Sequence, residues 1–152
     1  PAQLGSDLLV DSVAASALYP KPLIVADMGT ATTLTVVNDK NSIIGGAILP
    51  GVKTSLNALT SNTAQLQQIS IEAPKKAIGS NTVDCMRSGT VLGNASMLDG
   101  MIDRFNEELG ADCFVVSTGG LAEVISRHTK HKVIYNPNLL LEGLYILYKK
   151  NI

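Results

Sequence analysis

The sequence predicts an α/β domain with a mixed five-stranded sheet and flanking helices. Three β-rich runs follow one another between Leu23 and Leu49, separated by short polar turns, which is typical of consecutive antiparallel strands. Two further apolar runs, at 113–117 and 132–135, are each followed by residues with helical spacing. Strand–helix alternation favours parallel pairing, so the two patterns together indicate a mixed sheet. A chain of 152 residues is long enough for one domain with a substantial core.

The composition narrows the class of protein. Hydrophobic residues make up 45%, charged residues 16%, and the formal net charge is −1, values typical of a globular chain and not of a disordered one. No basic run suggests a nucleic-acid partner, and no apolar stretch is long enough to span a membrane. No segment resembles a secretory signal. We therefore expect a cytoplasmic protein without nucleic-acid or membrane partners.

The first predicted element is a helix that opens near Leu4. Ser6 or Asp7 is a candidate cap for it, since both side chains can accept a hydrogen bond from the first turn. Its expected apolar face comprises Leu9, Val13 and Ala17.

A polar turn, Asp27-x-Gly29-Thr30, connects the first two predicted strands. Gly29 allows a tight bend and a close approach to the backbone, and Thr30, Thr32 and Thr33 offer hydroxyl groups. Such a turn, headed by a carboxylate, suits phosphate and cation binding. The motif is short, so an ordinary hairpin turn is the alternative.

The third strand follows a hairpin turn at 38–41. Gly45 and Gly46 within it indicate a bulge or a close approach. Pro50-Gly51 ends it, and a helix is expected after Gly51. The residues at helical spacing that predict this helix are Val52, Leu56, Leu59, Thr63 and Leu66.

A long helix is predicted to begin at Ser80-Asn81-Thr82 and to end at Gly110. Its buried face comprises Val91, Ala95, Leu98, Ile102, Phe105 and Leu109. Gly89, Gly93 and Gly100 each cost roughly 1 kcal/mol of helix stability relative to alanine. Two interpretations of these glycines remain open: close packing inside the monomer, or a close helix pair between two subunits.

The strand at 113–117 leads into Thr118-Gly119-Gly120 and then a short helix. A strand, a glycine pair and a helix recur in nucleotide sites, because backbone N–H groups face outward and no side chain blocks a ring. Asn136-Pro137 ends the last strand, and a terminal helix begins near Leu139.

These motifs, in this order, resemble the type III pantothenate kinases, a branch of the actin-like, sugar-kinase-like ATPases. The matching motifs are Gly5-x-Asp7, Asp27-x-Gly29-Thr30-Ala-Thr-Thr, Gly45-Gly46-x-Ile48-x-Pro50-Gly51, Asn81-Thr82 and Thr118-Gly119-Gly120. The resemblance runs from Gly5 to Leu144. It implies a ribonuclease-H-like (actin-like ATPase) fold and a likeness of residues 1–152 to the carboxyl-terminal half of a two-domain kinase, with the amino-terminal half absent.

The resemblance also implies roles for individual residues. Asp7 would be the catalytic base, and Asp27 would bind a monovalent cation, potassium or ammonium. The substrate pantothenate would be bound by Gly5, Ser6, Asp7, Leu8 and Thr82, and the nucleotide by Gly29, Thr30, Gly119 and Gly120. Leu8 departs from the family, which has an arginine there. Asn81 and Thr82 serve equally well as helix caps, and that alternative stays open.

The implied activity is transfer of the γ-phosphoryl group of ATP to pantothenate, which yields 4'-phosphopantothenate in the first step of coenzyme A biosynthesis. ATP, magnesium and the monovalent cation are the expected cofactors, and a homodimer is the expected assembly. We expect the isolated chain to be inactive. The alternatives are a non-catalytic binding or regulatory member of the family, or a related kinase acting on another small hydroxylated substrate.

Overall fold

The computed structural model describes residues 5–152, so Leu4, near which the first helix was expected to open, lies outside the described residues. The elements in chain order are α1 (Ser6–Leu18), β1 (Leu23–Met28), β2 (Ala31–Val37), β3 (Ile43–Pro50), α2 (Val52–Ser61), α3 (Thr82–Leu109), β4 (Phe114–Thr118), α4 (Ala122–Ser126), β5 (Val133–Tyr135) and α5 (Leu139–Lys150).

The strands form one five-stranded sheet in the order β3-β2-β1-β4-β5. The first three strands pair antiparallel, whereas β4 and β5 pair parallel to β1 and to each other. The prediction of a mixed five-stranded sheet is therefore confirmed. In this register Asp27 of β1 lies between Thr33 of β2 and Thr118 of β4.

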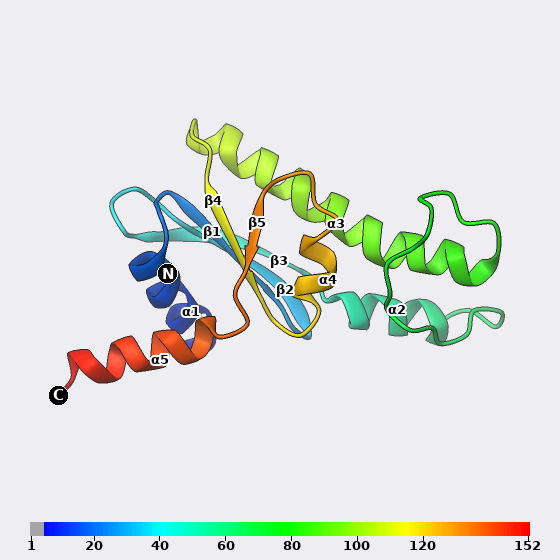
Figure 1. Ribbon diagram of the computed structural model, residues 1–152, viewed down its shortest axis with the longest axis horizontal. Coiled ribbons are helices and arrows are strands. Elements are labelled where there is room, and N and C mark those ends of the chain that lie inside the picture. Colours follow the sequence, from blue (N-terminus) through cyan, green and yellow to red (C-terminus); the bar gives the residue numbers. More distant parts are fainter. Residues whose placement is uncertain (1–4) are drawn as a thin grey trace.

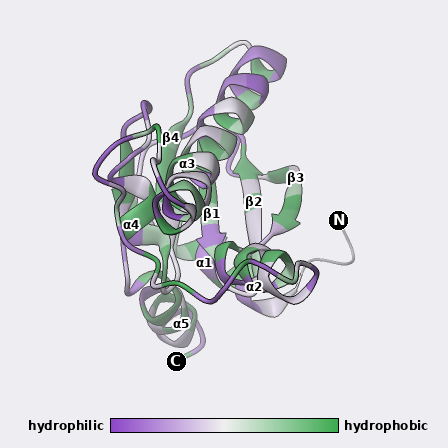
Figure 2. Cartoon of the chain, turned by 90° about the vertical axis from the view of Figure 1, so that its right-hand side faces the viewer, coloured by the Kyte–Doolittle hydropathy of each residue, from purple (hydrophilic) through white to green (hydrophobic). Residues whose placement is uncertain are grey.

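Helices cover both faces of the sheet. In Figure 1, α1 and α5 lie together on one side, and the long α3 runs along the other. Because side chains alternate along a strand, β1 sends Ile24 and Ala26 to the face of α3, and Leu23 and Val25 to the face of α1 and α5. In Figure 2, much of the sheet has the green colour of hydrophobic residues. Each fully buried Val, Leu or Ile side chain contributes roughly 1.5–3 kcal/mol.

The first helix differs from its prediction. Its N-cap is Gly5, and no side chain caps it, so the expectation that Ser6 or Asp7 is the cap is wrong. Its buried residues are Asp11, Ser12, Ala14 and Ala15, whereas Leu9 is 49% exposed. The helix therefore turns a small, partly polar face to the sheet, which apolar spacing alone does not reveal.

The hairpin between β2 and β3 agrees with its prediction. The Asn38 side chain accepts hydrogen bonds from the N–H groups of Lys40 (3.1 Å) and Ser42 (2.9 Å). The register shifts in β2 at Val36/Val37, where β3 brings Gly45. A Cβ atom on Gly46 would collide with the Leu34 carbonyl. The predicted glycine pair therefore provides both a bulge and a close approach.

The helices after β3 follow the predicted pattern only in part. Helix α2 ends at Ser61, so Thr63 and Leu66 belong to the connection and not to the helix. In α3 the Asn81 side chain accepts from the Asp84 N–H (2.9 Å) and caps the helix, and Gly110 ends it with φ +64°. Both predicted ends of α3 are thus confirmed.

Of the helices between residues 5 and 152, none is long and apolar enough to cross a membrane.

Candidate functional site

The carboxyl ends of β1 and β4 lie side by side because these strands are parallel neighbours, with Asp27 opposite Thr118. The first turns of α1 lie over the same edge of the sheet. Together these elements enclose a pocket of about 340 Å³, whose lining includes Asp7, Asp11, Asp27, Thr118, Gly119 and Gly120. We call it the acidic pocket. Tyr135 of β5, Pro137 of the following connection and Leu140 of α5 complete its wall.

The turn after β4 requires glycine at one position. Gly119 has φ +103°, and a Cβ atom there would lie 2.6 Å from the Met28 carbonyl oxygen. The turn is therefore pressed against the end of β1. Gly120 is exposed, and a Cβ atom there would meet nothing within 4 Å. The side of the turn at Gly120 is thus open to a planar ligand.

The Gly29-Thr30 turn follows Asp27 directly and is supported by the start of α2. The Thr30 carbonyl accepts hydrogen bonds from the Gly51 N–H (3.2 Å) and from the Thr54 hydroxyl (2.8 Å). A side chain at Gly51 would collide with the carbonyl oxygens of this turn. Both Gly29 and Thr30 are exposed, so the turn is held in shape while its outer surface stays accessible.

The three carboxylates of the acidic pocket repel one another. Burial, with Asp27 and then Asp7 nearby, raises the pKa of Asp11 to about 6. Burial and the neighbouring Asp7 also raise the pKa of Asp27. No lining residue of the pocket is Lys, Arg or His. A positive group from outside the chain would therefore relieve this repulsion.

The carboxylates of the acidic pocket fit a cation whose remaining coordination comes from a bound ligand. Asp11 is 2% exposed, and its Oδ1 atom is buried without a hydrogen-bond partner among the described residues. Hard cations such as magnesium prefer carboxylate oxygen, and often bind through one or two carboxylates plus phosphate oxygens and water. Across residues 5–152 no three acidic, His or Cys side chains converge into a complete metal site. The arrangement suits an ion shared with a phosphate.

Other predicted substrate residues lie around the start of α1. Gly5 precedes the helix, and the Ser6 hydroxyl donates to Asp7 Oδ1 (3.4 Å). Both residues are exposed, whereas Leu8 is half-buried and does not line the acidic pocket. These residues therefore border the pocket, and Asp7 alone among them lines it.

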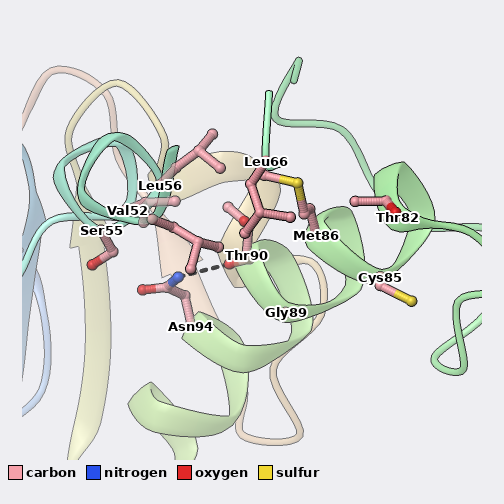
Figure 3. Close-up of a pocket in the computed structure, with 11 residues that line it drawn as sticks. Val52, Ser55, Leu56, Leu66, Thr82, Cys85, Met86, Gly89, Thr90 and Asn94 are labelled. Carbon is pink, nitrogen blue, oxygen red and sulfur yellow. Dashed lines mark hydrogen bonds between the residues drawn. The ribbon is translucent and has the colours of Figure 1, made fainter. Parts of the chain in front are cut away.

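Thr82 lies in a different place from the other predicted site residues. It lines a pocket of about 580 Å³ between α2 and α3. Figure 3 shows Val52, Leu56 and Met86 around this pocket and Thr82 at one end. The structure does not bring Thr82 into the acidic pocket of its own chain.

Sequence reasoning missed Asp11. Its spacing of four residues from Asp7 was the available signal, because residues at i and i+4 share a helix face. Tyr135 gave no such signal, since its position depends on the pairing of β5 with β4. Leu140 gave none either, because its place at the pocket depends on how α5 packs in the folded chain.

Comparisons with known proteins agree with these motifs. Residues 1–104 match a family model described as type III pantothenate kinase. The chain is 44% identical over 151 residues to the type III pantothenate kinase of Roseiflexus sp. (strain RS-1), covering 99% of this chain and 59% of the relative. It is 45% identical over 157 residues to that of Rubrobacter xylanophilus, covering 99% and 60%. The chain thus spans about 60% of the length of these curated relatives.

Solved structures share the fold. A conserved Campylobacter jejuni protein assigned to the Baf family of transcriptional activators superposes with a TM-score of 0.66 at 23% identity, covering 97% of this chain and 65% of that one. The ethanolamine utilization protein EutJ of Carboxydothermus hydrogenoformans gives 0.54 at 20%, covering 88% and 50%. The predicted ribonuclease-H-like, actin-like ATPase fold is confirmed. Because the family model matches residues 1–104, which is more than half of the chain, the chain belongs to the type III pantothenate kinase family.

Proposed function

We propose that this chain carries one part of the site of an ATP-dependent pantothenate kinase. The reaction is phosphorylation of pantothenate to 4'-phosphopantothenate, the first step of coenzyme A biosynthesis, in the cytoplasm. One observation carries the proposal: the acidic pocket brings Asp7, Asp27 and the Gly119-Gly120 turn together from three distant parts of the sequence. Membership of the family supplies the substrate class.

The two glycine turns provide the nucleotide side of the site. Gly119 and Gly120 would border the adenosine, since the open surface at Gly120 admits a ring. Gly29 and Thr30 would contact the phosphates through a turn that Gly51 and Thr54 hold in place. Phosphoryl transfer depends mainly on positioning and charge stabilisation, and rigid turns of this kind serve positioning.

Asp7 provides the base. It lies in the first turn of α1, where its side chain is exposed and lines the pocket. Asp7 accepts the proton of the pantothenate hydroxyl as the hydroxyl oxygen bonds to the γ-phosphorus. The bond from that phosphorus to the β–γ bridging oxygen breaks, and ADP leaves with the electron pair.

Asp27 would hold the monovalent cation, potassium or ammonium, and magnesium would accompany the nucleotide. The bound cations neutralise negative charge on the phosphates. Asp27 suits this role because it lies immediately before the phosphate turn and has no cationic partner among the ion pairs of the described residues.

The proposed role of Thr82 requires a homodimer. A Cβ atom on Gly89, Gly93 or Gly100 would meet nothing within 4 Å, so these glycines do not serve close packing among residues 5–152. We propose that they face the same helix of a second subunit, and that Thr82 contacts pantothenate across this junction. Gly89 also lines the pocket that contains Thr82.

Leu8 favours a second candidate, a kinase of the same fold acting on another small hydroxylated substrate. The family resemblance places an arginine at this position as part of the pantothenate site, and leucine offers no charge for a carboxylate. A non-catalytic member of the family would instead bind nucleotide without transferring a phosphoryl group, or would do neither.

The experiment measures transfer from γ-labelled ATP. The chain is assayed alone and fused to the part of the Roseiflexus relative that it does not span, with pantothenate and a panel of hydroxylated acids and sugars. We expect labelled 4'-phosphopantothenate from the fusion, abolished by Asp7→Asn and unaffected by Asp39→Asn in the exposed β2–β3 turn. Transfer only to another compound would support the second candidate. No transfer by a folded fusion would contradict both kinase assignments.

A further inference from the structure

Asn136 lies where β5 ends and the chain turns towards α5. Its neighbours on both sides, Tyr135 and Pro137, line the acidic pocket. A residue before proline is restricted to extended backbone, and the Asn136 N–H donates to the Ser117 carbonyl (2.8 Å). Because Ser117 lies two residues before Gly119, this bond ties one wall of the pocket to the start of the turn after β4.

The side chain of Asn136 uses both of its N–H groups and its oxygen within the chain. Its Nδ2 atom donates to the Tyr19 hydroxyl (2.9 Å) and to Glu142 Oε2 (2.8 Å). Its Oδ1 atom accepts from the Asn138 N–H (3.0 Å). These partners fix the orientation of the amide, because a flipped amide would place its oxygen against the Glu142 carboxylate.

Both acceptors of the Asn136 amide are themselves held in place. Tyr19 is the C-cap of α1, and its ring stacks on that of Phe114 in β4, with centroids 5.1 Å apart and an interplanar angle of 15°. Glu142 lies in the first turn of α5. The next residue, Gly143, packs so closely on α1 that a Cβ atom there would collide with the Val10 carbonyl. The amide therefore joins the end of β5 to two helices that are fixed independently of it.

We propose that Asn136 is a positioning residue for the acidic pocket: it holds Tyr135, Pro137 and Leu140 as a fixed wall and so sets the affinity of the pocket for ATP. The inference rests on the proposed function for the identity of this ligand. Asn136 acts through the wall and contacts no reacting atom. The wall lines the same pocket as the Gly119-Gly120 turn, so both sides of the nucleotide would be fixed before it binds.

Burial alone would hold this wall less firmly. Leu140 is exposed and Tyr135 is half-buried, although Leu139 between the wall residues is fully buried and anchors the start of α5. Apolar burial is non-directional, whereas hydrogen bonds prefer a narrow range of angles. The bonds of Asn136 therefore supply the direction in which the chain leaves β5. A wall that is ordered in advance lowers the entropy cost of binding a ligand.

The test reverses the donor and the acceptor of one hydrogen bond. Asn136→Asp keeps the size of the side chain but puts a carboxylate oxygen against Glu142, so the two groups repel. Adding Glu142→Gln restores the pair, because the glutamine amide donates to the new carboxylate. Tyr19→Phe removes one acceptor but keeps the stacked ring, and it serves as the milder variant if Asn136→Asp unfolds the chain. Asn138→Asp is the matched control, since Asn138 is exposed and its side chain does not cap α5.

Saturation-transfer difference NMR gives the Kd of each full chain for ATP, and circular dichroism selects the folded variants. We expect ATP binding on the order of 10-fold weaker in Asn136→Asp and roughly threefold weaker in Tyr19→Phe, with the double variant and the control within about twofold of the wild type. In the fusion with the Roseiflexus relative, the KM for ATP should rise by the same factors while kcat changes less.

Wild-type ATP affinity in a folded Asn136→Asp or Tyr19→Phe variant would overturn the proposal. So would a folded double variant that binds ATP no better than Asn136→Asp. Lower stability in urea with an unchanged Kd for ATP would likewise mean that Asn136 only holds the fold.

Hydrogen exchange of the backbone amides in 135–142 separates this inference from the proposed function. If no chain binds ATP, but exchange in this segment rises in Asn136→Asp and returns in the double variant, the nucleotide assignment fails and the role of Asn136 in holding the wall stands. If every folded chain binds ATP equally, the role of Asn136 fails and the nucleotide site stands. Unchanged exchange in Asn136→Asp would contradict the role of Asn136 in either case.

Discussion

Replacing Gly119 with alanine tests whether the nucleotide turn depends on its close approach to β1. Gly119 has φ +103°, and an added Cβ would lie 2.6, 2.7 and 2.9 Å from the O, C and N atoms of Met28. The positive φ alone costs alanine roughly 1–3 kcal/mol. Relief of three backbone overlaps requires the end of β4 to move from β1, so we expect Gly119→Ala to lower the free energy of unfolding by about 2–4 kcal/mol.

Gly120→Ala is the matched control in the same turn. An added Cβ there meets nothing within 4 Å, and the residue has no positive φ. We expect a change within about 1 kcal/mol, since alanine at a compatible site mainly restricts the unfolded chain. Urea unfolding followed by circular dichroism measures both variants. Equal midpoints and slopes for Gly119→Ala and the wild type would refute the close approach.

Three further changes test other parts of the account. In the fusion with the Roseiflexus relative, Asp27→Ala should lower the rate of phosphoryl transfer from ATP and weaken the dependence of that rate on added cation. Initial rates measure both effects. Unchanged rates would mean that Asp27 only shapes the turn. Because folding raises the pKa of Asp11 from 3.8 to about 6, the folded chain keeps a proton that the unfolded chain releases over this interval. With chelator present, the free energy of unfolding should therefore fall as pH rises from about 4 to about 6, by roughly 2–3 kcal/mol more in the wild type than in Asp11→Asn; parallel urea-unfolding curves would contradict this. Gly93→Leu should shift a dimer towards monomer in sedimentation experiments while the helical signal persists, and an unchanged dimer would place the contact elsewhere.

Much of the fold follows from local patterns that the structure confirms. The three antiparallel strands come from β-rich runs separated by a turn in which the Asn38 side chain satisfies two backbone N–H groups. Helix α3 follows from apolar residues spaced three and four apart, of which Val91, Ala95, Leu98 and Ile102 are buried, together with an Asn81 cap and a Gly110 stop. These features depend on residues close in sequence, and one sequence reveals such signals directly.

The features that the sequence did not predict correctly depend on tertiary contacts. Helix α1 buries Asp11, Ala14 and Ala15 because its surroundings, and not its hydrophobic spacing, select the face. The acidic pocket could be predicted in part, since Asp27 and Gly119 follow strands, whose parallel pairing brings them to one edge. The involvement of Asp11 became visible only when burial and the missing partner of its Oδ1 atom were known.

The most direct test of the central claim is whether the acidic pocket binds ATP. Saturation-transfer difference NMR detects even weak contact between the chain and the adenine protons of ATP. We expect a signal from the wild type and from Asp39→Asn, and a strongly reduced signal from Gly120→Val, which adds a side chain at the open surface of the turn. No adenine signal from the folded wild type, or an equal signal from a folded Gly120→Val variant, would contradict the assignment of this pocket to the nucleotide.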